Sequence, residues 1–211
     1  MKYWKPMIFL ASIREETGVT LSNLNLGGGY GVRYTAEDEA IDIPARLAEL
    51  AAYLKEETER LGLPMPRFLM EPGRSIVADA GMTLYTVGSV KRIPGYKQYA
   101  AVDGGMTDNP RYALYQSRYT VYHAHKSGSM ERFDVVGRCC ESGDIIQPGV
   151  ELPGDTCRGD ILAVCTTGAY NYSMASNYNR LPRPAVVMLT PDRIYEAVRR
   201  ETFADLTGLD L

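Results

Sequence analysis

The chain has 211 residues, of which 45% are hydrophobic and 23% charged, so it has the composition of a globular protein with a buried core. Its formal net charge of −3 argues against a broad basic face, and nucleic acid is therefore not expected as a partner. No apolar run approaches the roughly 20 residues that cross a bilayer, so no membrane partner is expected. Four cysteines and two histidines without a Cys-x-x-Cys pair predict reduced thiols, no metal site and a cytoplasmic location.

The first part of the chain has the pattern of parallel α/β units. A helix is predicted for 9–17, with the short apolar run at 7–10 assigned to it, and another for 43–61, where leucines recur at helical spacing. Short apolar strands are predicted at 21–26 and 68–70. Each strand runs into a polar loop, which is the order expected of βα units. Two such units neither close a barrel nor complete a sheet, and by themselves they would expose strand edges and apolar helix faces.

After Gly81 the pattern changes to that of a β domain. Glycine and proline turns, such as Pro94-Gly95, Pro148-Gly149 and Pro153-Gly154, separate short runs rich in β-forming residues. Strands are predicted at 82–93, 98–102, 118–123, 133–138, 161–166 and 185–189, with a short helix at 173–177 and a strand followed by a charged helical tail at 194–206. These features predict an antiparallel β domain over residues 82–211.

Two loops at the carboxyl ends of the predicted strands carry residue types that hold a charged ligand. Gly27-Gly28-Gly29 lets backbone N–H groups approach an anion, although a plain tight turn explains the same residues. Glu71-Pro72-Gly73-Arg74-Ser75 places a carboxylate, a glycine and an arginine on the second loop, or else forms a surface turn with a salt bridge. In eight-stranded α/β barrels the phosphate site is often built from the loops after the last two strands, so the two loops together favour a phosphate site.

Five motifs follow one another in a characteristic order. They are the glycine triplet, Glu71-Pro72-Gly73-Arg74, Asn109-Pro110-Arg111-Tyr112-Ala113-Leu114-Tyr115, Cys140-Glu141-Ser142-Gly143-Asp144 and Gly168-Ala169-Tyr170. With these motifs the chain resembles the diaminopimelate decarboxylases from about its first helix to its last residue. Enzymes of that family have the alanine-racemase fold and use pyridoxal 5′-phosphate. The resemblance implies the last βα units of a TIM-type barrel at residues 1–81, followed by a Greek-key β-barrel or sandwich at residues 82–211.

The resemblance also implies a cofactor site. Gly27, Gly28 and Gly29, with Gly73, would bind the cofactor phosphate, and Tyr170 would lie beside it. Glu71 would pair with the pyridine nitrogen. A carboxylate in that place keeps the ring protonated, and a protonated ring accepts electrons as CO2 leaves.

A substrate site is implied by the same resemblance. Arg74, Arg111 and Tyr115 would hold the carboxylate groups of the substrate, since the guanidinium fork matches a carboxylate. Glu141 would receive the distal ammonium, and Cys140 would lie over the reacting carbon as an acid. In the family these last two residues enter the site of the other subunit, so the active enzyme is expected to be a homodimer. The implied reaction converts the amino acid meso-2,6-diaminopimelate to L-lysine and CO2.

One part of the family pattern has no counterpart in the sequence. The family's cofactor-binding lysine and a histidine that stacks on the cofactor lie on earlier barrel strands, and no segment here matches them; Lys2 and Lys5 do not lie on a suitable strand. We therefore expect the chain to be the carboxy-terminal half of such an enzyme and to be inactive by itself.

Other interpretations stay open. The chain can be a non-enzymatic β-domain interaction module, in which Arg111 is a surface arginine beside a turn, Tyr115 packs in the core and Glu141 is a turn carboxylate. It can also belong to an ornithine- or lysine-type decarboxylase, since these share the glycine and Glu-Pro-Gly-Arg loops. Ornithine-type enzymes carry Cys-Asp where this chain has Cys140-Glu141, and Arg111 provides a partner for a second substrate carboxylate, so diaminopimelate is preferred.

Overall fold

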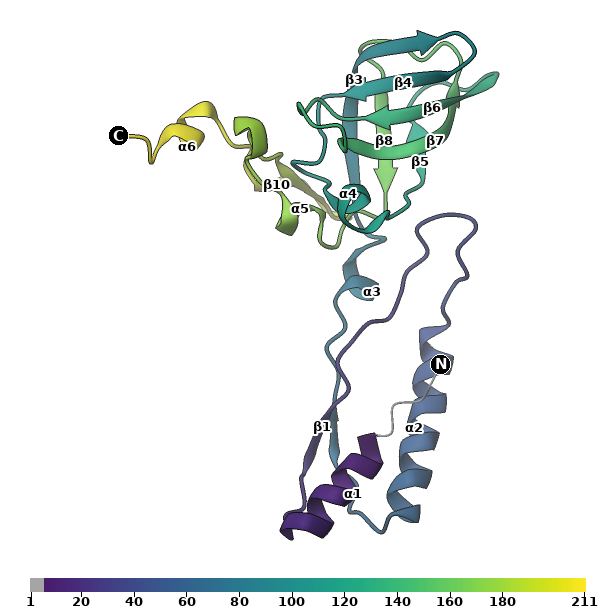
Figure 1. The fold of residues 1–211 in the computed structure, drawn as a ribbon, viewed down its shortest axis with the longest axis vertical. Helices are drawn as coiled ribbons and strands as arrows, with labels where there is room; N and C mark the ends of the chain where they lie inside the picture. The colour runs from purple at the N-terminus through teal and green to yellow at the C-terminus, as the bar shows by residue number, and fades with distance from the viewer. Residues whose placement is uncertain (1–5) are drawn as a thin grey trace. The chain divides into compact units, whose positions relative to one another are not determined.

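The computed structural model describes residues 6–211, so Lys2 and Lys5 lie outside the described residues. The chain divides into two compact units, shown in Figure 1. The first unit comprises the residues up to Val32 together with Glu39–Ile76, and the second comprises Arg33–Asp38 and Val77–Leu211. Within residues 6–211, no helix combines the length and the apolar character that a membrane crossing requires.

The first unit contains two helices and a short parallel sheet. Helices α1 (Pro6–Thr17) and α2 (Ile43–Arg60) accompany strands β1 (Asn23–Asn25) and β2 (Arg67–Leu69), which pair in parallel. Helix α2 begins where the Asp42 side chain accepts a hydrogen bond from the Ala45 N–H at 2.9 Å, with a proline in the first turn. The predicted helices, strands and βα order are confirmed here.

The core of the first unit is small. Its buried members come from α1, α2 and the segment after α2: Met7, Leu10, Leu54 and Leu63. Other apolar side chains of the same elements stay exposed, including Phe9 on α1, Leu47 on α2 and Leu69 on β2. The prediction that these units expose apolar helix faces and open strand edges is confirmed, because among residues 6–211 the strands β1 and β2 pair only with each other.

The second unit is built on a six-stranded sheet in the order β5-β8-β3-β4-β6-β7. The strands are β3 (Met82–Ile93), β4 (Lys97–Val102), β5 (Val121–His123), β6 (Met130–Val136), β7 (Ile145–Pro153) and β8 (Ile161–Cys165). The outer strands β5 and β7 contact each other, so the sheet curls into a nearly closed barrel (Figure 1). Alternate side chains from every strand fill it: Tyr85, Val87, Ala100, Val102, Val121, Phe133, Val135, Ile146, Val150, Leu152, Leu162 and Val164.

Two predictions for this sheet are wrong. It is mixed rather than antiparallel, because β4 pairs in parallel with β6, with Tyr99 opposite Asp134. The long connection between these strands, which includes β5, permits the parallel pairing. In addition, Pro148-Gly149 lies within β7 instead of in a turn. A proline is tolerated there because β7 ends the strand order and its pairing with β6 is irregular.

Short helices and a terminal hairpin complete the second unit. They are α3 (Arg74–Val77), which begins before it, α4 (Arg111–Tyr115), α5 (Asn171–Met174), the 3₁₀ turn η1 (Tyr178–Arg180), β9 (Val186–Leu189), β10 (Ile194–Val198) and α6 (Phe203–Thr207). Helix α5 begins two residues before the predicted helix, and the predicted strand and helical tail at the end of the chain are confirmed. Helix α4 is an addition, because no helix is predicted from the sequence between the strands at 98–102 and 118–123.

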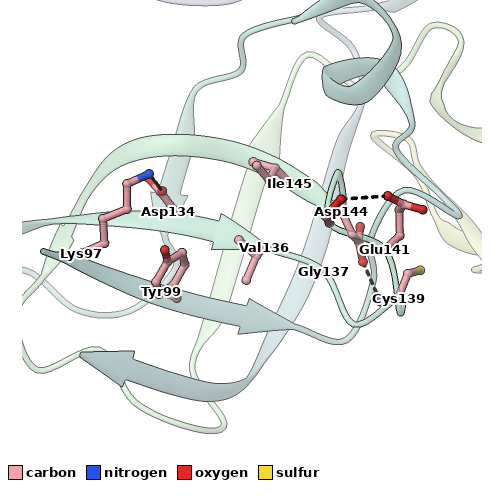
Figure 2. A pocket seen from close by; sticks show the side chains of 10 residues that line it. Lys97, Tyr99, Asp134, Val136, Gly137, Cys139, Glu141, Asp144 and Ile145 are labelled. Carbon is pink, nitrogen blue, oxygen red and sulfur yellow. Dashed lines mark hydrogen bonds and ion pairs between the residues drawn. The ribbon is translucent and has the colours of Figure 1, made fainter. Parts of the chain in front are cut away.

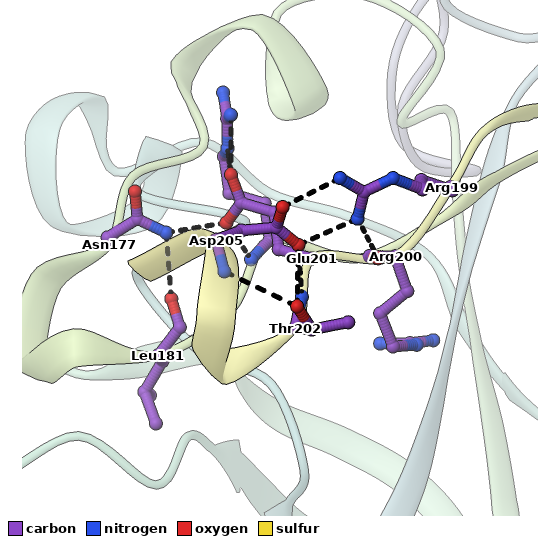
Figure 3. Close-up of polar contacts among 8 residues, drawn as sticks. Asn177, Leu181, Arg199, Arg200, Glu201, Thr202 and Asp205 are labelled. Carbon is purple, nitrogen blue, oxygen red and sulfur yellow. Dashed lines mark hydrogen bonds and ion pairs between the residues drawn. The ribbon is translucent and has the colours of Figure 1, made fainter. Parts of the chain in front are cut away.

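A polar network holds the end of the chain in place (Figure 3). The Glu201 carboxylate accepts hydrogen bonds from Arg183 Nε at 2.7 Å and from Asn177 Nδ2 at 2.7 Å. Arg199 forms a two-pronged ion pair with Asp205, whose side chain also closes a capping box at the start of α6.

Candidate functional site

The two loops predicted to bind an anion lie against each other in the first unit. Strands β1 and β2 pair in register, so the loops that follow them leave the same edge of the sheet. The Glu71 N–H donates to the Gly27 carbonyl oxygen at 2.7 Å. A Cβ atom at Gly28 would lie 2.2 Å from the Glu71 carbonyl oxygen, so only glycine permits this approach. The glycine triplet is therefore more than a plain tight turn.

The backbone of the triplet matches an anion-binding nest. Gly27 and Gly29 have φ values of +69° and +86°, and Gly28 stands between them. The N–H groups of Gly28 and Gly29 make no hydrogen bond with any residue in 6–211. Alternating left-handed residues turn successive N–H groups toward one point, where a phosphate oxygen is a suitable acceptor. The residues thus fit a phosphate group.

The loop after β2 carries both a negative and a positive side chain, Glu71 and Arg74. The Glu71 carboxylate accepts a hydrogen bond from Asn25 Nδ2, so its partner is Asn25 and not Arg74, as the salt-bridge interpretation required. Arg74 begins helix α3, and its Nε atom is buried without a hydrogen-bond partner among the described residues. A buried donor of this kind favours a bound acceptor, and Gly73 beside it leaves open space.

In the second unit the structure brings Arg111, Tyr115 and Tyr170 together. Arg111, which is only 7% exposed, starts helix α4, and its Cζ atom lies 5.4 Å from the ring centroid of Tyr115 and 5.0 Å from that of Tyr170. Its Nε donates to the Tyr119 hydroxyl at 2.9 Å. No carboxylate among residues 6–211 forms an ion pair with it. The interpretations of Arg111 as a surface residue and of Tyr115 as core packing are wrong, since Tyr115 is exposed.

Tyr170 has an unusual backbone. Its φ value is +72°, in the left-handed region that tyrosine rarely adopts, and it precedes helix α5. Gly168, two residues earlier, packs so closely on Val77 that a Cβ atom would lie 1.9 Å from the Val77 carbonyl oxygen. Strained residues of this kind cluster at ligand sites, where the surrounding structure holds them. The exposed ring of Tyr170 is thereby fixed beside Arg111.

Cys140 and Glu141 lie on another loop of the second unit. The Cys140 N–H donates to Asn179 Oδ1 at 3.0 Å, and the Glu141 carboxylate accepts from the Gly143 N–H at 3.2 Å. Both residues are exposed. Cys140 is a free thiol, as is Cys139, so the vicinal pair forms no disulfide. These two side chains therefore face solvent and are available to a ligand or a partner.

A buried carboxylate organises this loop. Asp144 accepts hydrogen bonds from the N–H groups of Met106 and Cys139, each at 2.6 Å. Burial, together with the adjacent Asp144 charge, raises the pKa of the Cys139 thiol to about 11. Asp144 has no assigned role among the predicted site residues; its position at the end of the Cys-Glu-Ser-Gly-Asp motif was the available signal.

A hollow of about 340 Å³ lies beside the loop. Figure 2 shows the ion pair of Lys97 and Asp134 at one end of it, and Cys139 and Glu141 at the other. The exposed Glu141 thus lines this hollow on the barrel surface.

Three further side chains with structural roles were missed, and two of them support predicted site residues. Asn25 holds Glu71, and Tyr119 holds Arg111. Asp108, whose pKa is raised by burial, accepts hydrogen bonds from the Tyr85 hydroxyl and the Gly105 N–H. No local sequence pattern marks these residues, because each acts on a partner distant in the chain or joins neighbouring loops.

The chain is similar to several known decarboxylases. It is 50% identical over 190 residues to the diaminopimelate decarboxylase of Bacillus subtilis (strain 168), covering 89% of this chain and 43% of that protein. A solved diaminopimelate decarboxylase from M. jannaschii in complex with L-lysine matches 97% of this chain and 46% of its own, with 32% identity and a TM-score of 0.86. A lysine/ornithine decarboxylase from Vibrio vulnificus complexed with cadaverine matches less well, with 25% identity and a TM-score of 0.68 over 82% of this chain and 45% of its own.

The chain thus spans about half the length of the curated relatives it matches. A family model described as the C-terminal sheet domain of pyridoxal-dependent decarboxylases matches residues 13–168, which include the glycine triplet, Glu71, Arg111 and the Cys140-Glu141 loop. The chain belongs to the pyridoxal-dependent decarboxylase family.

Proposed function

We propose that this chain forms the cofactor-phosphate and substrate-recognition part of a decarboxylase that converts meso-2,6-diaminopimelate to L-lysine and CO2. In this proposal residues 1–81 are the last βα units of a TIM-type barrel, and residues 82–211 are a Greek-key β domain. The working enzyme is a cytoplasmic homodimer with shared active sites. Cys140 and Glu141 are exposed on one loop, so they are accessible to a partner subunit. This exposure supports the proposal that the two subunits share active sites.

The proposal rests on the burial of Arg111, which forms no ion pair with any residue in 6–211. A guanidinium that has lost most of its water and has no counter-charge is costly to bury. A ligand carboxylate offsets that cost, and the planar fork recognises it in two-pronged fashion. Tyr115 and Tyr170 lie against the same group and remain exposed, so they can contact the same ligand. An interaction module has no need of such an arrangement.

The cofactor, pyridoxal 5′-phosphate, supplies an electron sink for the pair of electrons left when CO2 departs. The N–H groups of Gly28 and Gly29, with Gly73 nearby, would hold its phosphate.

Glu71 would hold a proton at the ring nitrogen, and Asn25, which donates a hydrogen bond to the Glu71 carboxylate, would orient it for that task. The other side chains act on the substrate. Arg74, Arg111 and Tyr115 hold the substrate carboxylates, with Arg111 at the distal one. Glu141 binds the distal ammonium, and Cys140 delivers a proton from Sγ to the reacting carbon.

A diamine-producing decarboxylase is the second candidate. Lysine and ornithine carry a single carboxylate, which is the one that leaves as CO2, so their distal ends present only an ammonium. A buried guanidinium at that end would then remain without a partner. The buried Arg111 therefore favours a substrate with a second carboxylate.

The test uses a chimera in which this chain replaces the matching portion of a diaminopimelate decarboxylase relative. Arg111→Ala should lower kcat/KM for meso-diaminopimelate by about 30- to 5,000-fold, since a lost buried charge pair costs roughly 2–5 kcal/mol. Inhibition by L-lysine, which keeps the distal carboxylate, should weaken in parallel. Inhibition by cadaverine, which has no carboxylate, should change little.

A matched control is Arg118→Ala, because Arg118 is an exposed arginine paired with the exposed Glu37. Arg118→Ala should leave kcat/KM for meso-diaminopimelate, and inhibition by L-lysine and by cadaverine, near the parent values. Equal weakening of L-lysine and cadaverine inhibition in Arg111→Ala would show that Arg111 does not bind the distal carboxylate.

A further inference from the structure

We propose that Tyr119, supported by Asn171, is a positioning residue that aims the Arg111 guanidinium so that it grips a carboxylate through its two terminal nitrogens. This inference rests on the proposed function and concerns the geometry of its substrate site. Tyr119 is 3% exposed and precedes β5, whereas Arg111 starts α4 and Asn171 starts α5. Figure 1 shows α4 and α5 at the same end of the barrel.

The hydrogen bonds around Arg111 leave one edge of the guanidinium available. Its Nε donates to the Tyr119 hydroxyl at 2.9 Å, and Nη2 makes only a long contact of 3.5 Å with Ser117 Oγ. Nη1 has no hydrogen-bond partner anywhere in residues 6–211. The rings of Tyr115 and Tyr170 lie against the guanidinium. A carboxylate cannot use the Nε edge, so it is directed to the edge formed by Nη1 and Nη2.

Tyr119 can orient Arg111 without neutralising it. Burial raises the pKa of the Tyr119 hydroxyl, so this partner is an uncharged phenol. Its oxygen accepts from Arg111, and its own hydrogen points toward Asn171 Oδ1 at 3.5 Å. An aspartate or glutamate at the same place would hold the arginine equally well, but it would compete with the ligand for the positive charge.

The ring of Tyr119 is itself held on several sides. The Tyr119 N–H donates to Gln147 Oε1 at 2.7 Å. The ring meets that of Tyr34 edge-on, with centroids 5.5 Å apart and an interplanar angle of 89°. Thr120 Oγ1 donates to the Tyr34 carbonyl oxygen at 2.9 Å and so holds the Tyr34 backbone at this place. The hydroxyl therefore stands at a fixed point, which a positioning role requires.

The test is Tyr119→Phe in the 211-residue chain, with two readouts. The first is hydrogen exchange of the Arg111 Nε–H, measured by ¹⁵N NMR without any ligand. We expect the variant to lose the protection that the parent chain shows. The second is binding of L-lysine and of cadaverine. Binding of L-lysine should fall by about 5- to 30-fold, corresponding to one or two kcal/mol, while cadaverine binding should stay unchanged.

Tyr85→Phe is the matched control. It also removes a buried hydroxyl from the barrel, but that hydroxyl bonds Asp108 and not Arg111. A general loss of stability would affect both variants alike, whereas positioning predicts an effect on Arg111 exchange only in Tyr119→Phe.

The two readouts separate the inference from the proposed function. Unchanged Arg111 exchange in Tyr119→Phe would overturn the positioning role. If the parent chain protects the Arg111 Nε–H but binds L-lysine no better than cadaverine, the positioning role stands and the proposed substrate fails. If exchange changes but both ligands lose affinity equally, the terminal-nitrogen grip is wrong.

Discussion

Gly28→Ala tests the close approach of the two loops in the first unit. The added methyl group would lie 2.2 Å from the carbonyl oxygen and 2.9 Å from the carbonyl carbon of Glu71. Both are backbone atoms and cannot rotate away. Ordinary contact begins near 3.4 Å, so the loops must separate by about 1 Å. That movement breaks the 2.7 Å hydrogen bond between the Glu71 N–H and the Gly27 carbonyl oxygen.

The expected cost has two parts. Overpacking strain contributes about 1–3 kcal/mol, and the lost hydrogen bond about 1 kcal/mol. The free energy of unfolding of the first unit should therefore fall by roughly 2–4 kcal/mol in Gly28→Ala. Urea titrations followed by NMR can assign the loss, with methyl signals of Met7 and Leu54 reporting on the first unit and those of Ile146 and Leu162 on the second.

Two other glycines provide graded controls. Gly29→Ala meets no atom within 4 Å but has a φ of +86°, so it should cost only the left-handed penalty of about 1–2 kcal/mol. Gly73→Ala meets no atom and has no positive φ, so it should change stability by less than about 0.5 kcal/mol.

A titration with inorganic phosphate extends the series. It should shift the amide signals of residues 28 and 29 in the parent chain, but not in Gly28→Ala. If Gly28→Ala is as stable as Gly73→Ala, the reasoning from loop contact is refuted.

Three more predictions follow from buried or paired ionisable groups. Asp144→Asn removes the charged acceptor of two backbone N–H groups and should lower the unfolding free energy of the second unit by about 2–3 kcal/mol in calorimetry. Iodoacetamide at pH 8 should modify the exposed Cys140 before Cys139, whose pKa of about 11 leaves on the order of one part in a thousand as thiolate. Hydrogen bonds from Arg183 lower the pKa of Glu201 from 4.5 to about 2, so this contact stabilises the tail above about pH 4.5 and is lost as the pH falls through 2, which NMR signals of residues 199–205 will follow.

Each of these has a control in the same chain. Asp155→Asn alters a largely exposed carboxylate and should leave the melting temperature unchanged. The rate at which iodoacetamide modifies Cys139 should rise about tenfold per pH unit up to the pKa of the thiol. A rate that does not change with pH would contradict the prediction that the Cys139 thiol is protonated at pH 8. Glu201→Gln should remove the acid-induced change in the tail signals; persistence of that change would assign it to another group.

The sequence by itself determined the local elements and the chemistry of the motifs. Helix α2 follows from leucines at helical spacing between a first-turn proline and a glycine stop, and β3 from a long β-forming run with turns at both ends. The five ordered motifs were sufficient to indicate the family, because each motif joins residues adjacent in the chain.

Only the tertiary structure decided how distant segments meet. The parallel pairing of β4 with β6 depends on the path of the connection between them, and β7 passes through Pro148-Gly149 because it ends the strand order. Local sequence patterns do not indicate which distant strands pair with each other.

The same holds for the residues that support the site. Asn25 and Glu71 form a hydrogen bond although they are 46 positions apart in the sequence, and Tyr119 and Asn171 meet although they are 52 positions apart. Their hydroxyl and amide groups have ordinary local roles in any loop or strand. They acquire a functional role only where folding places them beside a charged group, and that placement depends on contacts between segments distant in the chain.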